Sequence, residues 1–202
     1  MISSREKAHY LQARIKRDVA NRKRIRIIYG FLIVMCTFVL LGVAFTFLRI
    51  FYATDLYHAF IYDWIGTAFL FLGGITLLLF IIYFSSVITI KNPQKISRNK
   101  VFLWAGTGII SLVTSVFIFQ ELSSLTINSV GDMKDYSNGV MKRDDLKVVE
   151  VYTGSSTKIA LIKTEEQELY LLDQKVFNIE EGKTYSFTYL ERTGNILNVE
   201  TK

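Results

Sequence analysis

Three long apolar runs occupy the first 120 positions of the chain. Residues 27–48, 64–90 and 101–120 contain no Asp, Glu, Lys, Arg or His. At 1.5 Å per helical residue, even the shortest run reaches about 30 Å, the thickness of the hydrocarbon core of a bilayer. The pattern therefore predicts three transmembrane helices. The middle run is longer than a perpendicular crossing needs, so we expect it to tilt or to extend into one interface.

After residue 121, long apolar runs give way to an alternation of apolar and polar residues, which is typical of half-buried β-strands. Turn signals that contain Gly, at 153–156, 180–183 and 192–195, separate these segments. Five or six short antiparallel strands predict a small β-barrel or sandwich, and hence an α+β membrane protein. The predicted strands lie at residues 146–152, 158–163, 168–172, 184–190 and 196–199, with a further candidate at 124–130 before a turn at 137–139.

The alternation also predicts which side chains form the core of the β-rich domain. On each strand, every second apolar residue is assigned to the buried face. The predicted core residues are Val149, Val151, Ile159, Leu161, Leu169, Leu171, Tyr185, Phe187, Tyr189 and Leu197.

The closing stretch of the domain carries a resemblance. Its sequence is Ile179-Glu-Glu-Gly-Lys-Thr-Tyr-Ser-Phe-Thr-Tyr-Leu-Glu-Arg-Thr-Gly-Asn-Ile-Leu-Asn-Val-Glu200. This stretch resembles the last strands of the OB-like barrels that are appended to small membrane proteins of the NfeD type. The resemblance covers about 22 residues of a hairpin pattern and implies an OB-like arrangement of the strands. No family is assigned from it.

Charge is divided unevenly along the chain. Residues 1–120 carry 14 Lys and Arg against four acidic residues, a net charge of +10, whereas residues 121–202 carry ten against 14, a net charge of −4. This asymmetry indicates a basic part that faces anionic membrane lipid. The single cysteine, Cys36, lies inside the first apolar run. No intramolecular disulfide can form, so the C-terminal domain must fold on its core alone.

Basic residues near the ends of the runs predict the orientation of the chain. Nine lie in residues 1–26 and four in residues 91–100, whereas residues 49–63 contain only Arg49. Because Lys and Arg are retained in the cytoplasm, we expect a cytoplasmic arm at 1–26, a transmembrane domain at 27–120 and an extracytoplasmic β-rich domain at 121–202. The absence of an N-x-S/T sequon from the exported part favours the plasma membrane of a bacterium.

Basic side chains of the N-terminal arm surround a narrow apolar stripe at helical spacing. Such a helix can lie on the inner leaflet and bind anionic lipid, or the charges can serve as a topology signal alone. We expect no nucleic-acid binding, because no aromatic residues are interleaved with the basic run. The basic residues are Arg14, Lys16, Arg17, Arg22, Lys23, Arg24 and Arg26.

Small residues in the second and third runs predict close helix packing, because they let helix backbones approach each other in lipid. The packing can occur within this three-helix unit, with a partner, or with a second copy, so the oligomeric state stays open. These residues are Gly66, Gly73 and Gly74 in the second run and Thr107, Gly108, Ser111 and Ser115 in the third.

Signatures of enzymes, metal sites and cofactor sites are missing from the sequence. It contains no H-E-x-x-H, G-x-S-x-G, C-x-x-C or P-loop pattern, and only two histidines. One local cluster, Asp55, His58 and Asp63, offers a partial metal site or an acid/base pair, against the alternative of an interfacial histidine. We therefore expect a protein that is not an enzyme and has no cofactor or metal.

The absence of ionisable residues from the apolar runs argues against a pump or a coupled transporter. The leading hypothesis is a membrane protein whose outer β-domain binds a protein partner at the cell surface, as an accessory subunit of a secretion or envelope complex or as a toxin-immunity protein. The alternative is a regulatory or structural subunit of a channel or transporter.

The orientation can be tested with reporter fusions. A reporter that is active only outside the cytoplasm should be active when fused after Lys202 and inactive when fused within residues 92–99, because basic residues flank the latter segment. A reporter active only in the cytoplasm should give the reverse pattern. A cytoplasmic position for Lys202 would contradict both the orientation and a binding role outside the cell.

Overall fold

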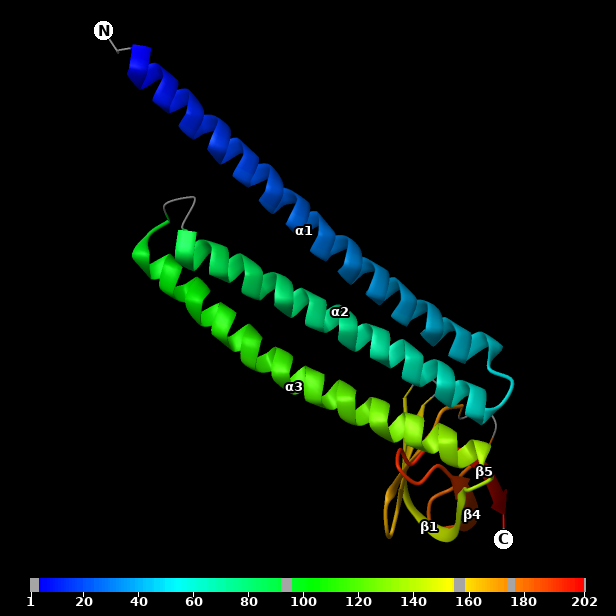
Figure 1. Cartoon of the computed structure of the whole chain (residues 1–202). Helices are drawn as coiled ribbons and strands as arrows, with labels where there is room; N and C mark the ends of the chain where they lie inside the picture. Colours follow the sequence, from blue (N-terminus) through cyan, green and yellow to red (C-terminus); the bar gives the residue numbers. More distant parts are fainter. Residues whose placement is uncertain (1–3, 92–95, 155–158, 174–176, 202) are drawn as a thin grey trace. The chain divides into compact units, whose positions relative to one another are not determined.

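Three long helices followed by one antiparallel sheet form the architecture. This computed structural model describes residues 4–91, 96–154, 159–173 and 177–201, without the side chains of 4–11, 13, 14 and 16–18. Its helices are α1 (Ser4–Tyr52), α2 (Leu56–Lys91) and α3 (Arg98–Ser137) (Figure 1). All three are long and apolar enough to cross a membrane. The predicted α+β layout is confirmed at this level.

Local interactions set two of the helix ends. Asp55 precedes α2, and its carboxylate accepts a hydrogen bond of 2.8 Å from the backbone N–H of His58, which is an N-cap. At the end of α3, Gly139 has a φ of 72°, a conformation that favours glycine. The N–H of Val140 donates to the carbonyl of Asp135 at 2.8 Å, and that of Gly139 to Tyr136 at 3.0 Å. This pair of hydrogen bonds is a Schellman C-cap.

The candidate strand at 124–130 is wrong, because these residues are part of α3. The segment is rich in Ser, Thr and Asn, which favour a helix weakly, and its apolar residues alternate over a short stretch. Leu122, Ser129 and Asp132 are nevertheless buried, and they share one helical face by their spacing. Tertiary contacts therefore override the local preference. Helix α3 continues from the end of the third predicted span to the turn before the sheet.

The five remaining predicted strands are all present in one sheet. Neighbouring strands are antiparallel, in the order β3-β2-β1-β4-β5. The predicted strand at 158–163 begins one residue before the described part, and the turn at 153–156 also lies partly outside it. The strands are β1 (Lys142–Thr153), β2 (Ala160–Thr164), β3 (Glu168–Leu171), β4 (Thr184–Tyr189) and β5 (Ile196–Thr201).

The sheet is open, so the predicted barrel or sandwich, with its OB-like closure, is wrong. The edges, β3 and β5, approach each other where the N–H of Tyr170 donates to the carbonyl of Gly194 at 2.9 Å. An isolated parallel bridge joins Tyr170 and Asn195 there. Among the described residues, β3 and β5 form this bridge and no continuous ladder. Barrel closure requires a continuous ladder, and β3 has four residues.

Two apolar clusters hold the β-domain. The larger one covers the inner face of the sheet, where Val148, Ile162, Leu169 and Phe187 are fully buried. The smaller cluster joins α2 to the sheet, and its buried members are Ala59, Phe60, Leu172 and Leu190. The beginning of α2 is thus part of the core of the C-terminal domain.

Core positions on β1 and β2 differ from the predicted ones. Val149 is exposed and Leu161 is half-buried, whereas Ala160 and Ile162 are buried. Val151, Ile159 and Leu197 are partly buried and pack against the two clusters. A bulge between Val148 and Glu150 shifts the alternation along β1, because two residues there oppose one on the partner strand. The predicted core on β3 and β4 is confirmed, since its five residues are buried.

Helices α1 and α2 approach closely at a pair of glycines. A Cβ atom at Gly66 would lie 3.2 Å from the carbonyl oxygen of Gly42 and 3.2 Å from the Cβ of Phe45. A backbone oxygen and a Cβ atom, which is fixed to the backbone, leave little room to adjust. The two glycines therefore set the local separation of these helices.

Replacement of Gly66 by Val should lower the unfolding temperature of the chain in detergent. The added side chain would force α1 and α2 apart, and overpacking of this kind typically costs about 1–3 kcal/mol. The matched control is Gly106→Val in α3, where a Cβ atom meets nothing within 4 Å. Both variants change helix propensity equally, so equal unfolding temperatures would contradict the close approach.

Candidate functional site

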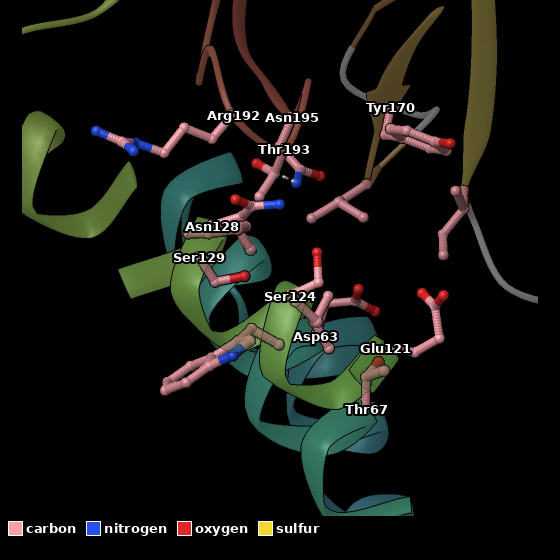
Figure 2. Close-up of a pocket in the computed structure, with 15 residues that line it drawn as sticks. Asp63, Thr67, Glu121, Ser124, Asn128, Ser129, Tyr170, Arg192, Thr193 and Asn195 are labelled. Carbon is pink, nitrogen blue, oxygen red and sulfur yellow. Dashed lines mark hydrogen bonds between the residues drawn. The ribbon is translucent and has the colours of Figure 1, made fainter. Parts of the chain in front are cut away.

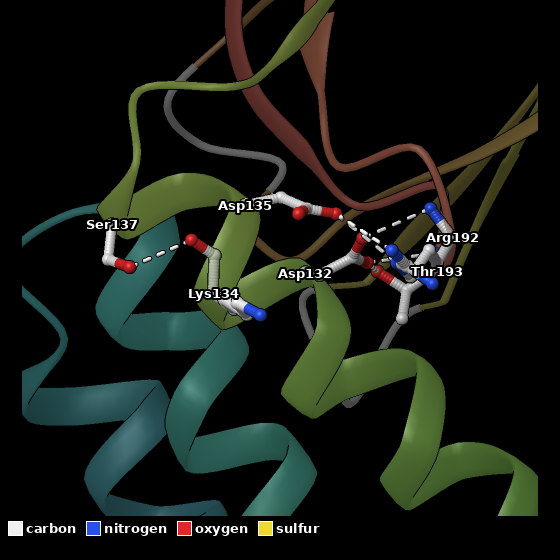
Figure 3. A network of polar contacts seen from close by, with 6 residues as sticks. All are labelled: Asp132, Lys134, Asp135, Ser137, Arg192 and Thr193. Carbon is white, nitrogen blue, oxygen red and sulfur yellow. Dashed lines mark hydrogen bonds and ion pairs between the residues drawn. The ribbon is translucent and has the colours of Figure 1, made fainter.

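A buried carboxylate connects the end of α3 to the sheet. The side chain of Asp132 is 1% exposed. It accepts hydrogen bonds from the backbone N–H groups of Arg192 (3.1 Å) and Thr193 (2.9 Å) and from the hydroxyl of Thr193 (2.6 Å) (Figure 3). We call this set the Asp132 latch. It satisfies a buried charge with three donors from the β4–β5 turn, as burial of a carboxylate requires.

The side chain of Arg192 extends the contact along α3. Its Nε and Nη2 atoms both donate to Asp135 Oδ2, each at 3.2 Å. The arginine stem crosses Gly131, where a Cβ atom would lie 2.6 Å from the Arg192 Nε. This ion pair is half-exposed, so we expect it to contribute little stability. The latch itself holds the turn.

An ion pair joins the ends of α1 and α2. Arg49 Nη1 lies 3.2 Å from Asp63 Oδ1, and the arginine side chain is 3% exposed. Both residues lie next to the boundaries of the predicted spans. Loss of this carboxylate would remove a counter-charge from a buried arginine, which is costly. Asp63 is therefore a structural partner of α1.

The predicted cluster of Asp55, His58 and Asp63 is brought together in part. His58 Nδ1 lies 2.7 Å from Asp55 Oδ2, whereas Asp63 pairs with Arg49. Burial alone would raise the pKa of Asp55, but the hydrogen bonds from the backbone and side chain of His58 lower it below its usual value. Within the described ranges, no group of three or more His, Cys, Asp and Glu could hold a metal ion.

A cavity of about 500 Å³ lies between α2, α3 and the sheet, beside the latch. Figure 2 shows the labelled polar side chains of the two helices and Thr193 and Asn195 of the β4–β5 turn around a common space, with the Arg192 side chain directed away from it. The volume is within the roughly 300–1,000 Å³ of small-molecule sites. The lining residues are Phe60, Asp63, Trp64, Thr67, Glu121, Ser124, Leu125, Asn128, Ser129, Ile159, Tyr170, Leu172, Arg192, Thr193 and Asn195.

Two buried donors line the cavity without a partner. Ser129 is 1% exposed, and neither its hydroxyl nor the indole nitrogen of Trp64 has a hydrogen-bond partner among the described residues. Buried polar groups are nearly always satisfied, so these two atoms stand out among the polar groups of the cavity lining. The third notable group is Glu121, which is exposed at the wall.

The residues of the basic arm lie on α1, which is one continuous helix with the first span. Arg22, Lys23 and Arg26 are exposed, and Arg24 is half-exposed. The side chains of the other three residues, Arg14, Lys16 and Arg17, lie outside the described part. Where it is described, the arm presents its charges outward, which leaves contact with anionic lipid as a prediction.

The small residues of α2 differ in their surroundings. Gly66 faces Gly42 of α1, as described above, and Gly73 is buried. A Cβ atom at Gly74 would meet nothing within 4 Å. Close packing at 66 thus contrasts with open space at 74.

The small residues of α3 lie in the unit formed by residues 1–38 and 73–115. A Cβ atom at Gly108 would lie 2.9 Å from the Cβ of Ser85 on α2, and Ser111 is buried. The hydroxyls of Thr107 and Ser115 donate within the helix, to Leu103 at 3.0 Å and Leu112 at 2.7 Å. Both hydroxyls are thus bonded within α3 itself. Packing of α3 against a helix of another protein or of a second copy stays a prediction.

Sequence reasoning missed the latch and the two buried donors. Ser129 and Asp132 fall in or beside the segment predicted as a strand, and Arg192 and Thr193 fall in a predicted turn. One signal was available, because Leu122, Ser129 and Asp132 follow helical spacing. The burial of Asp132 depends on contacts with residues about 60 positions away, which local patterns do not contain.

No protein-family model matches the chain, and the comparisons with curated proteins and with solved structures found no match.

Replacement of Asp132 by Ala should destabilise the attachment of the sheet to α3. Two backbone donors would lose a charged acceptor, so we expect a loss of about 3 kcal/mol. Hydrogen exchange at the amides of Arg192 and Thr193 should become faster. The matched control is Asp135→Ala, on the same helix, which should cost less than about 1 kcal/mol and leave those amides protected. Equal exchange in both variants would contradict the role of the latch.

Proposed function

We propose that the chain is a non-enzymatic membrane protein that crosses the bilayer three times and binds a protein partner through its extracytoplasmic β-domain. The observation that carries this proposal is a row of large side chains on the outer face of the sheet, Tyr152, Leu161 and Tyr170. We call it the outer-face row.

Strand pairing sets the outer-face row. Tyr152 is opposite Leu161, and Leu161 is opposite Tyr170. Tyr152 and Tyr170 are 48% and 41% exposed, whereas the adjacent residues Ile162 and Leu169 are fully buried on the other face. Tyrosine is enriched at protein interfaces, because its ring covers apolar area and its hydroxyl forms hydrogen bonds. The row is therefore a suitable centre for a contact surface.

Acidic residues lie beside the row on one side. The next register line contains Glu150, Lys163 and Glu168, so acidic side chains flank a single lysine. The pKa of Tyr152 is raised, first by a hydrogen bond with Glu150 and further by burial and by the nearby charges of Glu168 and Glu181. The domain carries a net charge of −4. Electrostatic complementarity thus favours a partner with a basic contact surface.

The Asp132 latch supports this role. It attaches the sheet to α3, one of the helices long enough to cross a membrane. A binding face on a firmly attached domain loses less conformational entropy when the partner binds. The role we favour is an accessory subunit of an envelope or secretion complex, or an immunity protein that binds an incoming toxin. In this proposal the basic arm contacts anionic lipid on the cytoplasmic side.

Photo-crosslinking in native membranes tests the binding face. A photoreactive residue at 163, between the two acidic residues, should give a discrete adduct with a second protein. The double variant Tyr152→Ser and Leu161→Ser should abolish this adduct without changing abundance. The matched control is Val140→Ser, which removes an exposed apolar side chain before β1 and should leave the adduct intact.

The same assay separates a channel or transporter subunit from the proposed function. Thr107, Ser111 and Ser115 changed together to Leu would disturb the surroundings of α3. We expect this variant to act mainly by lowering abundance. If the helix variant instead lost the partner at normal abundance while the outer-face double variant kept it, the β-domain would not be the binding site.

A further inference from the structure

The cavity lies at the depth expected for the bilayer surface. The second predicted span begins at Trp64 and the third ends at Gln120, and Trp64 and Glu121 both line the cavity. Ser129 follows Gln120 by nine residues along α3, a rise of about 13 Å. On the proposed membrane crossing, the cavity therefore begins at the edge of the hydrocarbon core and extends outward through the headgroup region.

The charged groups of the cavity limit the charge of its ligand. Asp63 is paired with Arg49, and Arg192 with Asp135. Glu121 has no ion-pair partner within the described ranges of the chain. The remaining charge at the wall is thus negative, which disfavours a phosphate or another anion, because like charges repel at close range.

The unpartnered donors limit the ligand further. The indole N–H of Trp64 can donate and cannot accept, and it is buried without a partner. An ammonium group offers it no acceptor. The buried hydroxyl of Ser129 can donate or accept, and the carboxylate of Glu121 only accepts. The wall therefore needs a neutral ligand whose groups donate and accept at the same time.

Hydroxyl groups on a sugar ring have this property. A sugar ring carries several of them, so one hydroxyl can accept from Trp64 while another donates to Glu121, and the amides of Asn128 and Asn195 offer further donors and acceptors. The ring of Tyr170 lines the same cavity and offers an apolar face to the C–H groups of a sugar. We propose that this cavity binds the neutral sugar headgroup of a membrane glycolipid.

Fluorescence of Trp64 reports binding directly, because a hydrogen bond to the indole N–H shifts its emission. Trp104→Phe leaves Trp64 as the single tryptophan of the chain and keeps an aromatic ring beside Phe84. The full chain with this change is purified in a dodecyl polyoxyethylene ether, which carries no sugar. Glucosyl diacylglycerol should shift the emission saturably, whereas phosphatidylglycerol and phosphatidylethanolamine with the same acyl chains should not.

Two variants test the assignment of the binding residues. Ser129→Ala and Glu121→Ala should each weaken glucosyl diacylglycerol binding about tenfold, the effect of losing one hydrogen bond to the ligand. Ser129→Ala removes an unpartnered hydroxyl, so the fold should tolerate it. The matched controls are Ser123→Ala and Glu166→Ala, which lie outside the cavity lining and should bind as the parent does.

The outcomes separate the sources of the sugar and the two proposals. An equal shift with either phospholipid, or unchanged affinity in both cavity variants, would overturn the site. Methyl glucoside binding as tightly as the glycolipid would show a soluble sugar site and overturn the lipid source. Tyr170 belongs both to the outer-face row and to the cavity lining, and the outer-face variant Tyr152→Ser and Leu161→Ser leaves it unchanged. That variant should therefore still bind the glycolipid, so the failure of one proposal leaves the other intact.

Discussion

A carboxylate removed from water organises the junction of this protein. Asp132 is fully buried, and its three hydrogen-bond donors all come from one turn of the sheet. The energetic cost of burying this charge is offset only when the turn is in place. The burial of Asp132 on α3 and the docking of the sheet therefore depend on each other. The position of the cavity follows from the same constraint. Its walls are the helices on one side and the anchored turn on the other.

Much of the fold could be predicted because its patterns are local. The apolar runs indicated the three helices, and the turn signals indicated the five strands. Which residues of β1 and β2 face the core could not be predicted, and the reason is physical. A bulge at Val148 and Glu150 changes the alternation on β1, and residues 159–162 are all apolar, so either phase of β2 has an apolar inner face. Contact with the neighbouring strands decides between them.

The candidate site was less predictable, because its residues meet across the chain. Asp55 and His58 are three residues apart, and their proximity followed from helical spacing. The pairing of Asp63 with Arg49 depends on the approach of α1 and α2, and the glycine at 66 was recognised as small without its partner at 42. Ser129 was assigned to a strand. Charges and hydroxyls acquire their roles here from tertiary packing, which a single sequence encodes only indirectly.

The latch also constrains the order of assembly during synthesis. Its partners are 60 and 61 residues apart, whereas the β2–β3 and β4–β5 hairpins join neighbouring segments. Local pairings close short loops at small entropic cost and form early, and contacts of long separation form late. The carboxylate of Asp132 therefore stays hydrated while the strands emerge and is buried only after the β4–β5 turn has been made. A sheet that lacks this turn therefore cannot dock on α3 through Asp132.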